Sequence, residues 1–259
     1  MSKNVVFLPA IVVKGNESRS APYKYGIDSW RRWCKKNNVE LFILDQLIYP
    51  VDYMKITWQR YMIHDLLEAN NIEYDQVLMM DCDSIIHPDT PNFFEMSENK
   101  FVGIHTQGSY DWVLRSMENY SKYIFDEAWF PFWEYIQGGF QITNKSHKQF
   151  YKDVIKFYQD HEPHIQEVQK FHVGTDQPML NFLLRKHNID MKLLPWEFSM
   201  SDMPRKEILD NDMTFTKCGW VYQYNAIPDN HDGRKTGEWM KKTYEYFYGE
   251  LKVVLVVRI

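Results

Sequence analysis

The first hundred residues alternate between short apolar runs and longer segments whose apolar positions recur every three or four residues. The short runs at 4–8, 39–44 and 76–80 predict strands, and the segments at 23–36 and 57–69 predict helices. Strands separated by helices of this length need crossover connections, which are right-handed and place helices on both faces of a parallel sheet. The pattern therefore predicts an α/β fold, whose ligands bind beyond the carboxyl ends of the strands.

The pattern is less regular after residue 100. It predicts further strands at 101–104, 140–143 and 219–224, and helices at 146–158, 175–186 and 236–248. Ser146, with Gln149 three residues on, and Thr175 are the expected caps of two of these helices. We expect Pro163 to interrupt any helix there, which argues against a metal site at His161 and His164. This half of the chain is predicted to be mixed.

Two carboxylates, Asp81 and Asp83, come directly after the third predicted strand. Residues i and i+2 of an extended chain point to the same side, so these carboxylates converge outside the edge of the sheet. A cation relieves their repulsion, and hard divalent ions prefer carboxylate oxygens. The pair predicts a Mg²⁺ or Mn²⁺ site. An isolated Asp-x-Asp leaves open the alternative that both residues only cap a loop.

Composition narrows the function classes. The 259 residues include 30 Lys and Arg against 35 Asp and Glu, for a net charge of -5. Because the basic residues are scattered, this balance argues against a nucleic-acid partner. No apolar run reaches the roughly 18 residues that span a bilayer, and the N-terminal run is too short for a signal peptide. We therefore expect a cytoplasmic protein without a transmembrane segment.

Four segments in chain order resemble the nucleotide-sugar glycosyltransferases of the glycosyltransferase A fold. YDQVLMMDCDSIIHPD, from residue 74, resembles their hydrophobic strand that ends in Asp-x-Asp. Residues 135–142 resemble the glycine-containing strand entry beside the donor sugar, and residues 174–181 the Asp-Gln-x-x-Leu-Asn helix start. Residues 230–235 are similar to the His-and-Gly element of the retaining glycogenin and galactosyltransferase group, although the glycine follows the histidine by two places instead of three.

The resemblance implies a Rossmann-like glycosyltransferase A fold, with a central, mostly parallel sheet flanked by helices and a mixed acceptor-side half. A single domain over 1–259 would comprise a nucleotide-binding half, 1–105, and an acceptor-binding half, 106–259. The implied activity is metal-dependent transfer of a sugar from a nucleotide-diphosphate sugar, with UDP as the expected nucleotide, to an acceptor hydroxyl of a glycan. The Asp-Gln pair and the His-and-Gly element favour retention of configuration.

The resemblance also implies roles for particular residues. The metal ligands would be Asp81, Asp83 and His231, and the catalytic pair Asp176 and Gln177. The nucleotide sugar would contact Pro9, Ala10, Asp45, Arg60, Gly233 and Lys235, with Lys55 and Arg234 as further basic candidates. Gly138 and Gly139 would let the main chain pass close to the donor sugar. If the enzyme inverts, the base would be a carboxylate such as Asp176, Glu197 or Asp202.

Two other functions remain open. One is a non-catalytic protein that binds carbohydrate or nucleotide with the same fold, since fold alone does not establish turnover. The other is nucleotidyl transfer, which would call for a basic, glycine-rich loop after the first strand. Residues 9–20 match that loop poorly, because they hold only Gly15, Lys14 and Arg19 of the required types.

The chain is rich in aromatic residues, with 16 Phe, 17 Tyr and 9 Trp. Many of them lie between residues 110 and 135, a region that would face the acceptor in the resembling fold. Aromatic rings offer flat apolar faces and polar edges that suit sugar rings. We therefore predict that Trp112, Trp129 and Trp133 include acceptor contacts.

Overall fold

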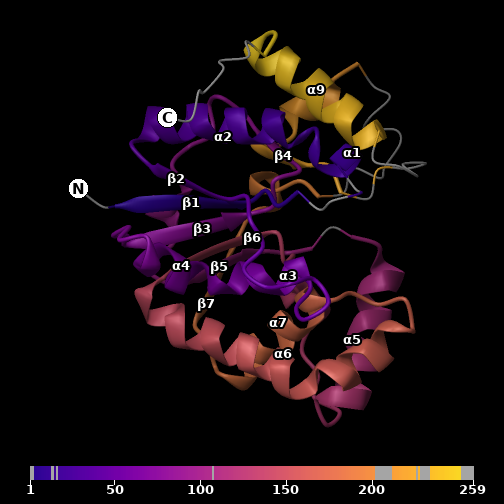
Figure 1. Cartoon of the computed structure of the whole chain (residues 1–259). Coiled ribbons are helices and arrows are strands. Elements are labelled where there is room, and N and C mark those ends of the chain that lie inside the picture. The colour runs from indigo at the N-terminus through magenta and orange to yellow at the C-terminus, as the bar shows by residue number, and fades with distance from the viewer. Residues whose placement is uncertain are drawn as a thin grey trace.

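A computed structural model describes residues 3–12, 15, 17–106, 108–201, 212–225, 227 and 234–251. At its centre lies a six-stranded sheet in the order β2-β1-β3-β6-β5-β7 (Figure 1). The strands are β1 (Asn4–Pro9), β2 (Glu40–Leu44), β3 (Gln76–Met80), β5 (Phe101–Ile104), β6 (Phe140–Asn144) and β7 (Met191–Leu194). All are mutually parallel except β6, which runs antiparallel to β3 and β5. The predicted mostly parallel sheet with a mixed second half is confirmed.

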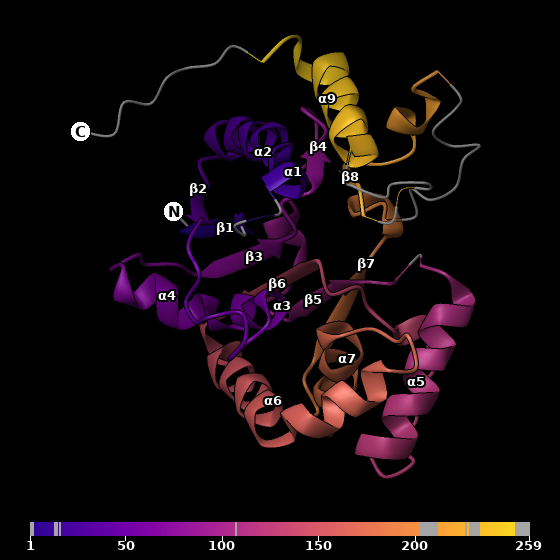
Figure 2. The same cartoon turned by 45° about the vertical axis from the view of Figure 1, so that its right-hand side comes forward.

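Helices cover both faces of this sheet, as predicted (Figures 1 and 2). Helix α2 (Tyr23–Asn37) covers one face, and the helices α4 (Ile63–Ala69), α5 (Tyr110–Ile124), α6 (Lys148–Gln169) and α7 (Asp176–Lys186) lie on the other. Neighbouring residues of β1 show why both faces need cover: Val6 packs with α2, while Val5 packs with the helices opposite.

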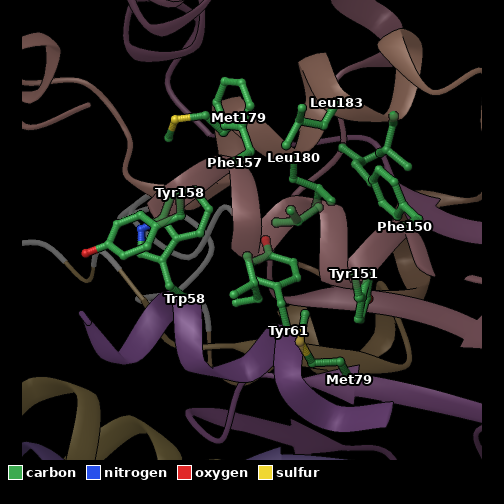
Figure 3. Close-up of a cluster of buried hydrophobic side chains, with 14 of the residues drawn as sticks. Trp58, Tyr61, Met79, Phe150, Tyr151, Phe157, Tyr158, Met179, Leu180 and Leu183 are labelled. Carbon is green, nitrogen blue, oxygen red and sulfur yellow. The ribbon is translucent and has the colours of Figure 1, made fainter. Parts of the chain in front are cut away.

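Aromatic rings fill much of the core beneath the sheet (Figure 3). Trp58 stacks on Tyr158 with 4.5 Å between ring centroids, and Tyr61 meets Tyr151 edge-on at 5.3 Å. These contacts fix the segment that contains Trp58 and Tyr61 against α6. Part of the aromatic excess therefore serves core packing, next to the segment that carries Arg60.

The helix predicted at 57–69 is divided. Helix α3 (Ile56–Gln59) and helix α4 are separated by a 3₁₀ turn at Arg60–Met62. The Thr57 carbonyl, which an uninterrupted α-helix would pair with the Tyr61 N–H, accepts a hydrogen bond from Arg60 Nε at 2.8 Å. The Arg60 side chain thus bonds a carbonyl that an α-helix would pair with a backbone N–H, at the point where the α-helix gives way to the 3₁₀ turn.

The prediction that Pro163 interrupts a helix was wrong. Helix α6 continues through Pro163 to Gln169. Ile165 and Val168, beyond the proline, are buried in the core, so packing holds the last turns in place despite the lost hydrogen bond.

Of the two predicted caps, Ser146 was wrong and Thr175 was placed correctly. A 3₁₀ turn precedes α6, and Asn144 caps it, accepting from the Ser146 N–H while His147 Nδ1 accepts from the Asn144 N–H. Thr175 is the N-cap residue of α7, but its hydroxyl makes no capping hydrogen bond and donates to the Asp176 carboxylate.

A small second sheet stands beside the large one. Strand β4 (Ser84–Ile86), which the sequence pattern did not predict, pairs antiparallel with β8 (Val221–Gln223), the central part of the strand predicted at 219–224. Helix α9 (Arg234–Tyr248) packs on this ribbon and lies beside α2 and the short helix α1 (Glu17–Ser20) (Figure 2). The ribbon brings β8 next to the Asp-x-Asp segment. Among the described helices, none combines the length and the apolar character needed to cross a membrane.

Candidate active site

A pocket of about 280 Å³ lies where the carboxyl ends of β1 and β3 meet. Pro9, Arg60, Asp81 and Asp83, all predicted site residues, are among the residues that line it. Its wall also includes residues that the sequence pattern did not assign to a site, among them Arg19, Ser20, Tyr23, Ile56 and Thr57. The position agrees with the rule that parallel sheets bind ligands beyond the carboxyl ends of their strands.

The Asp81 carboxylate is held at both oxygens. Its Oδ1 accepts from Arg60 Nη1 at 2.8 Å, and its Oδ2 accepts from Gln223 Nε2, also at 2.8 Å. Gly139 lies against this arrangement, because a β-carbon at position 139 would overlap Asp81 Oδ2 and come within 2.5 Å of Gln223 Nε2. The glycine is therefore required by the close approach of β6 to the carboxylate.

Asp83 is in a different environment. The residue is partly buried, and its Oδ1 is closed off from solvent without a hydrogen-bond partner. Burial, together with the negative charge of Asp81, raises the pKa of Asp83 to about 7. A carboxylate oxygen that is buried and unsatisfied is costly unless a cation or a donor meets it.

These carboxylates fit a hard divalent cation. Mg²⁺ and Mn²⁺ prefer oxygen ligands, and a cation between Asp81 and Asp83 would relieve both their repulsion and the unsatisfied Oδ1. Within the part of the chain that the structure describes, no group of three or more His, Cys, Asp or Glu side chains could hold a metal. His231, the predicted third ligand, lies outside the described residues.

Arg60 is a buried cation between two carboxylates. The residue is 8% exposed, its Nη1 bonds Asp81 and lies 3.3 Å from the Gly138 carbonyl, and its Nη2 is 3.2 Å from Asp176 Oδ2. Burial alone would disfavour the charged guanidinium, but the charges of Asp176 and Asp81 outweigh it and raise the pKa of Arg60. The guanidinium is thus fully engaged by the protein.

Asp176 and Gln177 begin helix α7 behind Arg60. Asp176 is 3% exposed and accepts from the Tyr61 hydroxyl and the Thr175 hydroxyl, each at 2.9 Å. Gln177 Oε1 accepts from the Gly138 N–H at 2.7 Å. The predicted catalytic pair therefore fixes the position of Arg60 and of the Gly138-Gly139 segment.

Solved structures of glycosyltransferases are similar to this architecture. A glycosyltransferase involved in the glycosylation of the major capsid of PBCV-1 has a TM-score of 0.58 and 8% identity, over 93% of this chain and 99% of that chain. GlyE of Streptococcus pneumoniae TIGR4 has a TM-score of 0.50 and 13% identity, over 94% of this chain and 64% of that one. The chain has a glycosyltransferase fold. Mouse xyloside xylosyltransferase 1 aligns with a TM-score of 0.49 and 10% identity, over 87% of this chain and 98% of that chain.

No protein-family model matches the sequence, and no curated protein matches it. At these low identities, the similarity of the solved structures extends to the glycosyltransferase fold alone.

The other described residues that were predicted to contact the donor are not among those that line the pocket. Ala10 is buried and its N–H donates to the Leu44 carbonyl, while Asp45 is exposed and does not line the pocket. Lys55 Nζ donates to Gln169 Oε1 on α6. Lys235 lies on α9 and is partly buried.

Several candidates cannot be placed in the pocket. Gly233 and Asp202 lie outside the described residues, as does the side chain of Arg234. Glu197, a candidate base, lines a different pocket together with Trp196 and Trp220.

The three tryptophans predicted to contact the acceptor differ in exposure. Trp129 and Trp133 are 59% and 69% exposed, on the connection between α5 and β6. Trp112 is partly buried, packs against the core, and occupies the space that a side chain at Gly174 would need. The two exposed rings leave apolar surface free for a ligand.

Proposed function

We propose that the protein is a metal-dependent glycosyltransferase, which moves a sugar from a nucleotide-diphosphate sugar, with UDP as the nucleotide, to an acceptor hydroxyl of a glycan. The observation that carries the proposal is the pair Asp81 and Asp83, which converge on one pocket in a glycosyltransferase fold, with Asp83 Oδ1 buried and unsatisfied. That arrangement suits a cation and the phosphates that such a cation binds.

Asp81 and Asp83 would hold the divalent cation, with His231 as the proposed third ligand. When bound, the cation supplies Lewis-acid stabilisation of the diphosphate, which gains negative charge as the bond to the sugar breaks. Arg60 and Gln223 fix the orientation of Asp81 from both sides, so that the carboxylate needs little reorganisation when the donor binds. Pro9, Ala10 and Asp45 are proposed nucleoside contacts, and Gly233 and Lys235 proposed diphosphate contacts.

We assign Asp176 a positioning role in this mechanism. A nucleophile or general base must reach the substrate, whereas Asp176 is 3% exposed and its two oxygens accept from Arg60, Tyr61 and Thr175. Asp176 therefore acts through Arg60, which it holds against Asp81. Gln177 acts in the same way on Gly138, beside the proposed site of the donor sugar.

A screen of nucleotide sugars, with release of the nucleotide and transfer to glycan acceptors as readouts, tests the proposal. We expect one donor class to be turned over in the presence of Mn²⁺ or Mg²⁺ and to be inert after addition of a chelator. Metal-dependent binding of a nucleoside diphosphate without hydrolysis or transfer of any donor would favour a binding protein instead. Equal turnover with and without chelator would contradict the metal site.

A further inference from the structure

The proposed donor pocket has an uneven distribution of charge. Asp81 and Asp83 line it, and Asp176 lies directly behind Arg60. Arg60 is shared between Asp81 and Asp176, at 2.8 and 3.2 Å, so its single charge already faces two carboxylates. Two carboxylates thus line, and a third lies behind Arg60 next to, a site that is proposed to receive an anionic diphosphate. Binding of the phosphates therefore needs a cationic side chain that makes no hydrogen bond or ion pair within the protein.

Arg19 has this property. It lies in the last turn of α1, it is exposed, and it lines the same pocket as Asp81 and Asp83. Its charge acts on Asp83, whose pKa it lowers, but among the residues that the structure describes its guanidinium makes no ion pair and no hydrogen bond. A guanidinium presents five donors in a planar fork, which matches the oxygens of a phosphate.

A second group points to the same ligand. Thr57, on α3, also lines the pocket, and its Oγ1 is buried without a hydrogen-bond partner. A buried hydroxyl without a partner is rare in proteins, because it loses its hydrogen bonds to water. Arg19 therefore brings unused donors to a space of only about 280 Å³, and Thr57 would add one if its side chain turned to expose the buried Oγ1.

We propose that Arg19 binds the diphosphate of the donor, and that the Thr57 side chain turns on binding so that its hydroxyl donates to the same diphosphate. With a divalent cation bound, the three carboxylates and the two arginines carry a net charge of one positive unit, and without Arg19 they carry none. Arg19 therefore decides whether the site attracts a diphosphate. Both this charge balance, which includes the divalent cation, and the assignment of the anion as part of a nucleotide sugar rest on the proposed function.

Calorimetric titration of the full chain tests the proposal with inorganic pyrophosphate, UDP and uridine as probes, in the presence of Mg²⁺. The Arg19→Gln variant lacks a charged hydrogen bond to the phosphate, so it should bind pyrophosphate and UDP about tenfold or more weakly than the wild-type protein. Its affinity for uridine should be unchanged. The phosphate affinity of Arg19→Lys should lie between those of the wild-type protein and Arg19→Gln, because lysine keeps the charge but lacks the planar donors of the guanidinium. Thr57→Val should weaken both phosphate ligands by about threefold or more, and Thr57→Ser should restore them.

Lys24→Gln is the matched control, since Lys24 is an exposed cation close to Arg19 in sequence that does not line the pocket. UDP and pyrophosphate affinities for Arg19→Gln that lie within about twofold of those for Lys24→Gln would overturn the role of Arg19 and leave the proposed function standing. A selective loss of pyrophosphate binding in Arg19→Gln would support the anion site even if no sugar donor were ever turned over. Failure of the wild-type protein to bind either phosphate ligand would overturn both.

Discussion

Removal of the Arg60 guanidinium should destabilise the fold far more than removal of an exposed arginine. In Arg60→Met, Asp176 keeps only its hydroxyl donors while it remains 3% exposed, and Asp81 loses its partner at 2.8 Å. An uncompensated buried charge of this kind costs about 3–5 kcal/mol of unfolding free energy. At about 2 °C per kcal/mol for a chain of this size, that corresponds to a fall of roughly 6–10 °C in Tm.

The double variant Arg60→Met/Asp176→Asn separates charge from packing. If the cost arises from the unpaired Asp176 charge, replacement of both partners should recover about 2 kcal/mol or more of the loss. Arg32→Met is the control, because Arg32 forms an exposed pair with Asp28 and should cost about 1 kcal/mol or less. Denaturant unfolding monitored by circular dichroism measures all three. An Arg60→Met loss no larger than that of Arg32→Met would refute the reasoning.

Three further predictions concern other parts of the chain. Gly139→Ala should displace the Asp81 carboxylate and weaken Mn²⁺ binding by about tenfold, as measured by calorimetry, while Gly108→Ala, where an added β-carbon meets only ordinary contacts, should leave metal affinity unchanged. Burial lowers the pKa of His64 to about 4, below its unfolded value of about 6.5, so stability should be full above pH 6.5 and fall by up to about 3 kcal/mol as the pH drops towards 4. His64→Gln should flatten this part of the stability profile, and an unchanged slope would contradict the assignment. Replacement of both Trp129 and Trp133 by Ala should raise the acceptor KM without changing donor affinity or Tm, and an unchanged acceptor KM would remove them from the acceptor site.

The first half of the fold could be predicted because its signals are local. A buried parallel strand is a continuous apolar run, and β3 begins and ends at the residues that the pattern predicted, 76–80. The position of Asp81 and Asp83 at the carboxyl edge of the sheet follows from the same run. Helix α2 likewise shows its buried face in the sequence, through the spacing of Trp30 and Trp33.

The remaining parts of the site depend on contacts between distant segments. Gln223 reaches Asp81 across 142 residues of sequence, through the ribbon of β4 and β8, and β4 is too short to produce a pattern of its own. The sequence placed Arg60 on a helix, but its burial follows from Asp176, which lies 116 residues away. Unsatisfied polar groups such as Thr57 Oγ1 have no sequence signal, since they depend on how closely neighbouring elements pack.

The central claim is that Asp81 and Asp83 bind a divalent cation that is needed for sugar transfer. Its most direct test is the rate of nucleotide release from the best donor, after removal of metal by a chelator and again after return of Mn²⁺. The proposed function predicts that release stops without metal and recovers with Mn²⁺ in the wild-type protein and in Asp190→Asn, whose carboxylate lies on the exposed surface beside Lys100. It predicts no recovery in Asp83→Asn. Release that continues in the chelator, or an Asp83→Asn variant as active as Asp190→Asn, would contradict it.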